Sequence, residues 1–554
     1  MRNDAASFAI RLPREPTTLT RRIAEVVGRR LAELGGAHTA AGEPDVTVRF
    51  DLRQGIGPEG FQISDAGDGS ILITGNDERG LLYGAGRFLH GCRRTERGFA
   101  PGPWRGTSVP GKPVRGIYLA THFHNFYHEA PTDDVLRYIE DLALWGFNLV
   151  LVWFGMEEYT GMDDPGARAM IGRLRMLLRI VKDLGLDVCL GCIGNDGWKN
   201  PPVSIKADKM LPGHAGYHTR RDDHIYNLGN EVCPSKPGVP EMEVRFCREK
   251  LAAFADIGVD YWIVWPYDNG GCTCAECSPW GINGYLRMAE LLARTYRQEF
   301  PRGKVILSTW YFDRWADGEW AGITERFNRQ KPDWVDYIMA DDYGGVYPPY
   351  PLAHGSPGGF PMLSFPEISM HLHQPWGGFG AIPLPGYLQS LWDNTRGVLS
   401  GGVPYSEGIF EDMNKAICAQ LFWEPERPAM ETVKEYIGFF FSPAVVDEVT
   451  RAVQIMERNL ERKREVKDGI VRFVMKSTEE AEEALRLIEA AEMRLAPPVR
   501  TSWRWRLVRV RALVDAELAR NDFRVSETCA AAFRELTDMY HAEHARDVVK
   551  PPSA

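Results

Sequence analysis

The 554-residue chain lacks several features that would define whole classes of protein. No stretch approaches the roughly 20 consecutive apolar residues that span a bilayer. No basic block is present, and 65 Lys and Arg against 75 Asp and Glu give a net charge of −10. An acidic surface of this kind argues against nucleic-acid and anionic-membrane partners. The first residues, Met1–Ser7, lack the apolar core of a signal peptide. We therefore expect a cytoplasmic protein, although a mature exported chain would look the same.

Other absences narrow the chemistry. Ten cysteines in a chain of this length are too few for a disulfide scaffold. No Gly-x-Gly-x-x-Gly follows a predicted strand, and no phosphate-binding loop is present, so nothing favours a nucleotide site. No Gly-x-Ser-x-Gly elbow supports acyl transfer. What is abundant is aromatic surface, with 16 Trp, 20 Tyr and 25 Phe. Such rings are favoured where flat apolar ligand faces stack.

Short apolar strands alternate with helices in the middle of the chain. This pattern predicts a parallel sheet, and eight units fit a (β/α)8 barrel better than an open doubly wound sheet. The predicted strands are Arg115–Ala120, Asn148–Phe154, Asp187–Ile193, Asp260–Tyr267, Lys304–Trp310, Asp336–Ala340, Pro361–Phe365 and Gly402–Ser406. The helices between them include Asp133–Trp145, Ala167–Leu184, Glu241–Asp256 and Ile282–Glu299.

The chain divides into three expected parts. Residues 1–108 form a small α/β domain, 109–425 the catalytic barrel and 426–554 a helical domain. In the first part, Asn76 or Asp77 can cap a helix whose Gly80, Gly84 and Gly86 allow close approach to a sheet. Beyond Asn414 we expect no strand; long charged helices are predicted over Val445–Arg464, Thr478–Leu495 and Leu507–Tyr540.

Carboxylates and aromatic rings recur where the predicted barrel strands end, which is where a barrel places its active site. Paired carboxylates are what glycoside hydrolysis needs, and aromatic rings stack on sugar faces. The predicted catalytic residues are Asp268, Asp341, Asp342 and Glu367. The predicted substrate-binding residues are His122, His124, Trp153, Trp265, Tyr267, Trp310, Tyr343, Trp376 and Glu407. Each acid could instead cap a helix, and each ring could fill the barrel interior.

Two motifs resemble known glycosidases. The run from Gly75 to Gly84 (GNDERGLLYG) resembles the end of the small domain that precedes the barrel in α-glucuronidases and β-N-acetylhexosaminidases. The barrel then opens with Val114-Arg115-Gly116-Ile117-Tyr118, as theirs do, and a helical domain follows it, as in the α-glucuronidases. The resemblance implies a three-part glycoside hydrolase.

The α-glucuronidase resemblance also implies residue roles. It implies a general acid on the fourth strand, where this chain carries Asp268 instead of Glu. It implies basic carboxylates on the sixth and seventh strands, where Asp341-Asp342 and Glu367 stand. In the hexosaminidases an adjacent acidic pair lies on the fourth strand, whereas here the adjacent pair is on the sixth. Neither substrate therefore carries over to this chain.

Three cysteines, Cys272, Cys274 and Cys277, follow Asp268 in a Cys-x-Cys-x-x-Cys pattern. Thiolates so close together can share a structural zinc ion, which takes four ligands. Cys233 is the best fourth ligand and Cys192 the reserve. The expected role is to fold the loop that carries Asp268, not to catalyse. A disulfide and a set of reduced thiols are the alternatives.

The sequence thus predicts a glycoside hydrolase that needs no cofactor for catalysis and acts on a carbohydrate. Two alternatives remain open. One is a metal-dependent barrel enzyme that uses His122 and His124, with His371 and His373, as ligands. The other is a non-catalytic carbohydrate-binding barrel. The sequence leaves homo-oligomerisation open.

Overall fold

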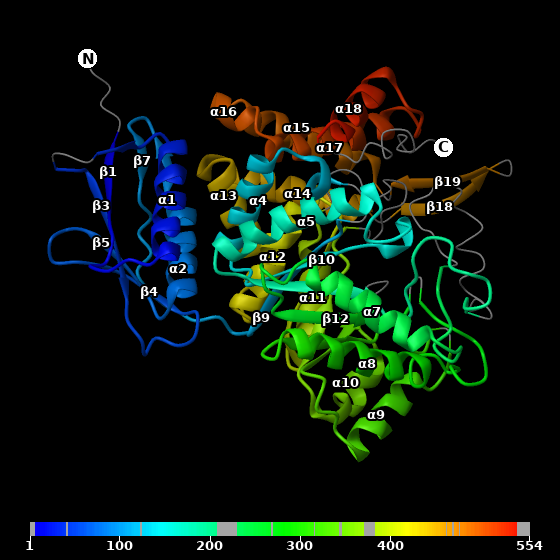
Figure 1. Ribbon diagram of the computed structural model, residues 1–554. Helices are drawn as coiled ribbons and strands as arrows, with labels where there is room; N and C mark the ends of the chain where they lie inside the picture. Colours follow the sequence, from blue (N-terminus) through cyan, green and yellow to red (C-terminus); the bar gives the residue numbers. More distant parts are fainter. Residues whose placement is uncertain are drawn as a thin grey trace.

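The chain folds into three parts, seen in a computed structural model. The structure describes residues 6–39, 43–121, 125–207, 230–267, 270–314, 316–342, 346–369, 383–460, 462–467, 470–475 and 477–539. A small α/β domain lies to one side of a barrel, and a group of helices covers another side (Figure 1). Among the described residues, no helix is long and apolar enough to cross a membrane.

The N-terminal domain is a six-stranded sheet covered by two helices, in the order β2-β1-β3-β5-β4-β8. Helices α1 (Thr18–Glu33) and α2 (Glu78–Gly91) lie on the side of this sheet that faces the barrel (Figure 1). The strands are β1 (Ser7–Arg11), β2 (Ala37–His38), β3 (Val46–Leu52), β4 (Phe61–Asp65), β5 (Ile71–Gly75) and β8 (Gly106–Ser108), and a separate hairpin pairs β6 (Arg93–Thr95) with β7 (Gly98–Ala100).

Helix α2 joins the small domain to the barrel. The Asp77 carboxylate caps it by accepting a 2.8 Å hydrogen bond from the Gly80 N–H. A Cβ at Gly80 would come within 2.1 Å of the Gly60 carbonyl oxygen, in the small domain. A Cβ at Gly86 would come within 2.1 Å of the Leu144 carbonyl oxygen, in the barrel. The predicted close approach is therefore confirmed, and it extends to both neighbours of the helix.

The barrel is a closed parallel sheet. From β9 to β16 each strand pairs with the next along the chain, and the barrel closes because β9 also pairs with β16 and with β17. The strands are β9 (Val114–Leu119), β10 (Leu149–Trp153), β11 (Asp187–Ile193), β12 (Tyr261–Trp265), β13 (Lys304–Ser308), β14 (Tyr337–Asp341), β15 (Met362–Phe365), β16 (Leu399–Gly402) and β17 (Tyr405–Ser406). All eight predicted strands are confirmed; the eighth is split into β16 and β17 around Pro404, which lacks the N–H a ladder needs.

Helices surround the barrel. They are α3 (Phe126–Glu129), α4 (Thr132–Leu144), α5 (Pro165–Asp183), α7 (Val239–Ala252), α8 (Gly284–Glu299), α9 (Glu319–Arg329), α10 (Pro349–His354), α11 (Pro385–Thr395) and α12 (Asp412–Trp423), with short turns η2 (Met156–Glu158) and η3 (Pro357–Gly359). The described residues between β14 and β15 hold α10 and η3 in place of a long helix.

The C-terminal part is mostly helical, as predicted. Its helices are α13 (Ala429–Phe440), η4 (Pro443–Val445), α14 (Val446–Leu460), α15 (Thr478–Glu492), α16 (Pro497–Arg500), α17 (Trp503–Arg520) and α18 (Glu527–Thr537). The prediction that strands end with the barrel is wrong. Helix α14 stops at Leu460, and β18 (Arg462–Lys467) pairs antiparallel with β19 (Ile470–Met475). The sequence between these strands is Asp-Gly, a strong hairpin turn signal that the helical charge pattern concealed.

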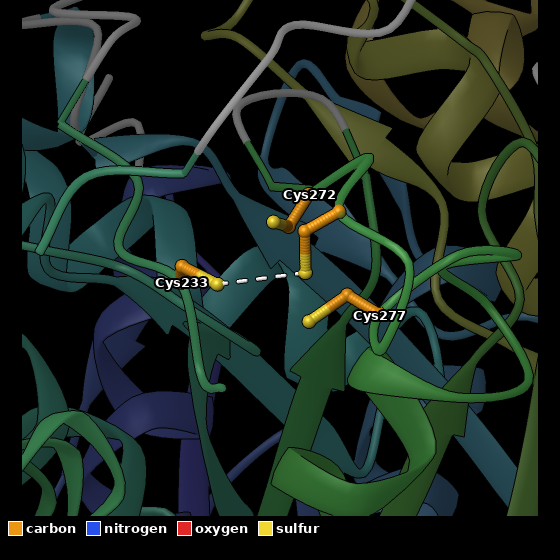
Figure 2. A group of neighbouring side chains, drawn as sticks. Cys233, Cys272 and Cys277 are labelled. Atoms are coloured by element: carbon orange, nitrogen blue, oxygen red, sulfur yellow. Dashed lines mark hydrogen bonds between the residues drawn. The ribbon is translucent and has the colours of Figure 1, made fainter. Parts of the chain in front are cut away.

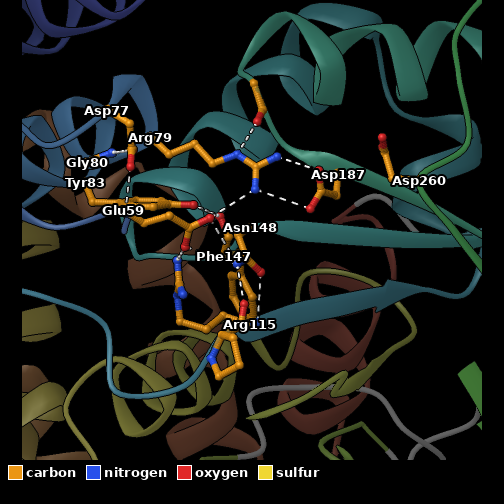
Figure 3. A network of polar contacts seen from close by, with 12 residues as sticks. Glu59, Asp77, Arg79, Gly80, Tyr83, Arg115, Phe147, Asn148, Asp187 and Asp260 are labelled. Carbon is orange, nitrogen blue, oxygen red and sulfur yellow. Dashed lines mark hydrogen bonds and ion pairs between the residues drawn. The ribbon is translucent and has the colours of Figure 1, made fainter. Parts of the chain in front are cut away.

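A partly buried ion network joins the small domain to the barrel (Figure 3). Glu59 accepts from Arg115 Nη2 at 2.5 Å and from Arg79 Nη1 at 3.0 Å, and Arg79 also pairs with Asp187 at 2.5 Å. The Arg115 side chain is fully buried. Burial alone would raise the pKa of Glu59, but the two guanidinium groups outweigh it and hold that pKa below its ordinary value. The network involves the first residues of β9 and β11, at the end of the barrel opposite its strand C-termini.

Candidate active site at the C-terminal ends of the barrel strands

Six aromatic rings, here called the aromatic floor, close the barrel interior at the C-terminal ends of its strands. Trp265 lies at the centre, with its ring centroid 4.9 Å from Phe365, 5.7 Å from Trp310 and 6.1 Å from Trp153. Tyr118 lies 5.3 Å from Tyr405, which lies 5.8 Å from Phe365. The members of the floor are Tyr118, Trp153, Trp265, Trp310, Phe365 and Tyr405, and all are less than a tenth exposed.

The rings meet because of strand alternation. Side chains point alternately into and out of a barrel, so the last inward position of each strand falls in the same layer. Trp153 and Trp265 end β10 and β12, and Phe365 ends β15. The structure thus brings together the predicted residues Trp153, Trp265 and Trp310. Their contact with a sugar stays a prediction, because the same rings also pack on one another.

Three carboxylates follow the floor on the same side of the sheet. Asp341 ends β14 and lies in register with Phe365, so both side chains point to the same face. Glu367 forms a parallel bridge with Tyr405. The Tyr405 hydroxyl donates to Glu407 Oε1 at 2.7 Å. Three of the predicted residues, Asp341, Glu367 and Glu407, therefore lie next to rings of the aromatic floor.

Backbone contacts hold Glu367 in place. Its Oε1 accepts a 2.9 Å hydrogen bond from the Ser369 N–H, and the Ser369 hydroxyl donates to the Tyr405 carbonyl at 3.0 Å. The Ser369 hydroxyl also accepts from the Glu407 N–H at 3.0 Å. A hydrogen bond to a carboxylate favours its ionised form. The Ser369 N–H therefore favours the ionised form of Glu367 and fixes one of its oxygens at the end of β15.

Asp342 points to the other side of β14 from its neighbour. It is fully buried, and no other described residue makes a hydrogen bond to either of its carboxylate oxygens. Burial raises its pKa well above the ordinary value, and the charge of Asp341 adds to this. An ionised Asp342 would also raise the pKa of Tyr387 on α11 and of Cys418 on α12. Burial and the neighbouring Asp341 charge therefore both favour the protonated form of Asp342, which lies behind the strand.

Tyr267 differs from the other predicted substrate-binding residues that the structure describes. It is fully buried, and its hydroxyl donates to the Glu319 carboxylate at the start of α9. Glu319 Oε1 also accepts from the Gly281 N–H at 2.6 Å. Burial raises the pKa of Glu319 to about 7 despite these hydrogen bonds. The structure thus places Tyr267 in a network between the loop after β12 and α9.

Several predicted residues lie outside the described part of the chain. They are Asp268, His122, His124, Tyr343 and Trp376, together with the alternative ligands His371 and His373. Their predicted roles therefore stay predictions.

A second acidic group was not among the predicted site residues. Glu157 and Asp196 follow β10 and β11, and Glu243 and Lys250 lie on α7; all four are buried. Burial raises the pKa of Asp196 to about 6 against the attraction of Lys250. Burial, with Asp196 nearby, raises the pKa of Glu157 and of Glu243 well above the ordinary value. Both strand-end acids are visible in the sequence, but their association with the charges on α7 is not.

The four predicted cysteine ligands meet beside the loop that follows β12. The Sγ atoms of Cys233, Cys272, Cys274 and Cys277 all lie within 4.8 Å of one another. Figure 2 shows Cys233 facing this loop from a separate segment of the chain. The reserve ligand, Cys192, is buried and is not a member of this group.

Comparisons with known proteins support the architecture. No family model and no curated protein sequence matches the chain. Solved structures do match. A GH138 enzyme targeting pectin rhamnogalacturonan II superposes with a TM-score of 0.59 at 13% identity, over 96% of this chain and 88% of that one. A GH115 4-O-methyl-α-glucuronidase with specificity for decorated arabinogalactans gives 0.59 at 12%, over 99% and 77%.

A family 89 glycoside hydrolase from Clostridium perfringens gives a TM-score of 0.61 at 13% identity, over 96% of this chain and 63% of that one. At such identities the likeness concerns the fold. The predicted three-part architecture, which resembles that of the α-glucuronidases, is confirmed at that level: a (β/α)8 barrel with a small N-terminal α/β domain and a helical C-terminal part.

Proposed function

We propose that the protein is a glycoside hydrolase that works with carboxylates at the C-terminal ends of the barrel strands. The observation that carries the proposal is the placement of Asp341 and Glu367 on the side of the sheet that holds the aromatic floor. Barrel enzymes place their chemistry at this end, and the similar solved structures are glycoside hydrolases.

The two carboxylates suit complementary tasks. Glycoside hydrolysis needs one group that protonates the leaving oxygen and another that attacks the anomeric carbon or activates water. Glu367, whose charge is stabilised by the Ser369 N–H, suits the role of base or nucleophile. Asp341 stands beside Asp342, and like charges so close make ionisation of both unfavourable. We assign Asp341 to contact with the substrate and keep Asp268 as the proposed general acid.

Hydrolysis of a panel of glycosides, including α-glucuronides and N-acetylhexosaminides, tests the proposal. We expect turnover of at least one member, and a loss of about 100-fold or more in kcat for Glu367→Gln. Glu325→Gln, which changes an exposed carboxylate on α9, is the matched control and should keep full activity. Sugar binding without hydrolysis by the unmodified protein would overturn the proposal in favour of a carbohydrate-binding barrel. Full activity of Glu367→Gln would overturn the assignment of that residue.

A further inference from the structure

We propose that Cys233, Cys272, Cys274 and Cys277 bind one zinc ion that fixes the loop after β12. Their four sulfur atoms lie within 4.8 Å of one another, and three of the four side chains are buried. Structural zinc sites are closed, tetrahedral and commonly made of four thiolates. Of the ten cysteines in the chain, these four form the one such group found among the described residues.

The spacing of the sulfur atoms suits a metal. Zinc–sulfur bonds of about 2.3 Å in a tetrahedron put neighbouring sulfur atoms about 3.8 Å apart. Cys233 Sγ and Cys274 Sγ are 3.7 Å apart. A disulfide would place two sulfur atoms about 2.05 Å apart, and it would join only two of the four cysteines. All four groups converge on one point, which neither a disulfide nor simple packing requires.

Groups around the cluster suit thiolate ligands. Four thiolates and one Zn²⁺ ion have a net charge of −2. Nearby hydrogen-bond donors and cationic side chains therefore stabilise such a site. The Ser235 hydroxyl lies 3.1 Å from Cys277 Sγ, and Arg287 Nη2 lies 3.7 Å from the same sulfur atom. Between Cys274 and Cys277 the chain turns tightly: the Cys277 and Ser278 N–H groups both donate to the Cys274 carbonyl, at 3.1 and 2.9 Å.

The cluster joins two segments that flank the strand ends. Asn195, which follows β11, already touches both: its amide donates to the Val232 and Gly271 carbonyls at 3.0 Å each, and its Oδ1 accepts from the Gly271 N–H at 3.0 Å. Cys233 is next to Val232, and Cys272 is next to Gly271. A zinc ion would cross-link the two segments and fix the loop after β12, which begins just beyond Trp265 of the aromatic floor. This positioning role rests on the proposed function, whereas metal binding does not.

Metal analysis of the whole protein, expressed with added zinc and purified without chelator, tests the site. We expect about one equivalent of zinc, and less than about a tenth of an equivalent in Cys233→Ser and in Cys277→Ser. Cys92→Ser is the matched control, since Cys92 is a buried thiol in the N-terminal domain that donates to the Phe88 carbonyl, and it should keep its zinc. If the cluster variants do not fold, Co²⁺ exchanged into the unmodified protein should show the absorption of thiolate-to-cobalt charge transfer.

Two results would overturn the site: less than about a tenth of an equivalent of zinc in the unmodified protein, or a disulfide between any of the four cysteines in the mass spectrum of the unreduced protein. The positioning role has its own readout. Removing zinc should lower hydrolysis, and adding zinc back should restore it. Zinc bound at one equivalent with no effect of its removal on activity would retain the site and reject that role. Zinc bound by a protein that hydrolyses no glycoside would retain the site and reject the proposed function.

Discussion

Asp341 and Phe365 lie side by side in the parallel register of β14 and β15, so a carboxylate and a ring of the aromatic floor share one face of the barrel sheet. Asp342, one residue further along, is fully buried on the other side of the strand. Adjacent acids in the sequence therefore have different surroundings. Of these two acids, Asp341 is the one that points toward the aromatic floor.

The adjacent acids should respond differently to substitution. Asp341→Asn should lower kcat by about 100-fold or more, as expected for loss of a group that touches the substrate. Asp342→Asn should keep activity within about tenfold, because burial favours the protonated form of Asp342, which is close in shape and charge to Asn. Steady-state kinetics on a substrate found in the panel, with thermal unfolding as a check on folding, measures both. Equal losses in the two variants would contradict the assignment.

Trp265 should report on a bound sugar. It lies at the centre of the aromatic floor, so a sugar stacked there should quench its fluorescence, and Trp265→Phe should remove most of the quenching. Trp262→Phe is the control, since Trp262 is on the same strand but stacks on Tyr296 of α8, with ring centroids 5.7 Å apart. Fluorescence titration with the substrate measures both. Quenching that survives in Trp265→Phe would place the sugar elsewhere.

Glu59 should stabilise the contact between the small domain and the barrel. Glu59→Gln leaves the buried Arg115 guanidinium without its anionic partner. This should lower the free energy of unfolding by about 3 kcal/mol. Asp65→Asn removes the partner of Arg105 at a site where the carboxylate is 66% exposed, and should cost less than about 1 kcal/mol. Urea unfolding measures both. Similar values for the two variants would show that this network is no stronger than a surface pair.

Asp196 should make stability depend on pH. Its pKa of about 6 in the folded protein lies above the ordinary value of 3.8, so between these pH values the folded state holds a proton that the unfolded state has lost. Stability therefore falls as pH rises through this window and stays lower above it. Asp196→Asn removes the cost of ionising this buried carboxylate. At pH 7.5 the substitution should raise the free energy of unfolding by on the order of 2–3 kcal/mol.

The increase in the free energy of unfolding caused by Asp196→Asn should be about half as large at pH 5 as at pH 7.5. Asp183→Asn, at an exposed position near the end of α5, should show no such trend. Urea midpoints at pH 5, 6 and 7.5 compare the two variants. A gain that does not grow with pH would mean that Asp196 carries no raised pKa.

Local sequence patterns were enough to predict the barrel. Eight apolar strands, each followed by a segment that could be a helix, leave few arrangements that bury every strand on both faces. The sequence also indicated a helix cap at Asn76 or Asp77, of which the structure has Asp77, and the small residues of α2, because capping and close approach depend on residue type at one position. The cysteine spacing likewise predicted a group of four that included Cys233, whose sulfur atom now lies among the other three.

Which acids face the floor depends on strand register, and therefore on the folded chain. Asp341 and Asp342 are equivalent in a sequence, and the register of β14 against β15 separates them. The same holds for Asp196, whose raised pKa comes from burial near α7, and for Tyr267, whose hydroxyl meets Glu319 52 residues away. Electrostatics and side-chain direction depend on neighbours brought together by folding, whereas strand and helix patterns are local. Local patterns could therefore predict the architecture, but the individual role of each carboxylate required the three-dimensional structure.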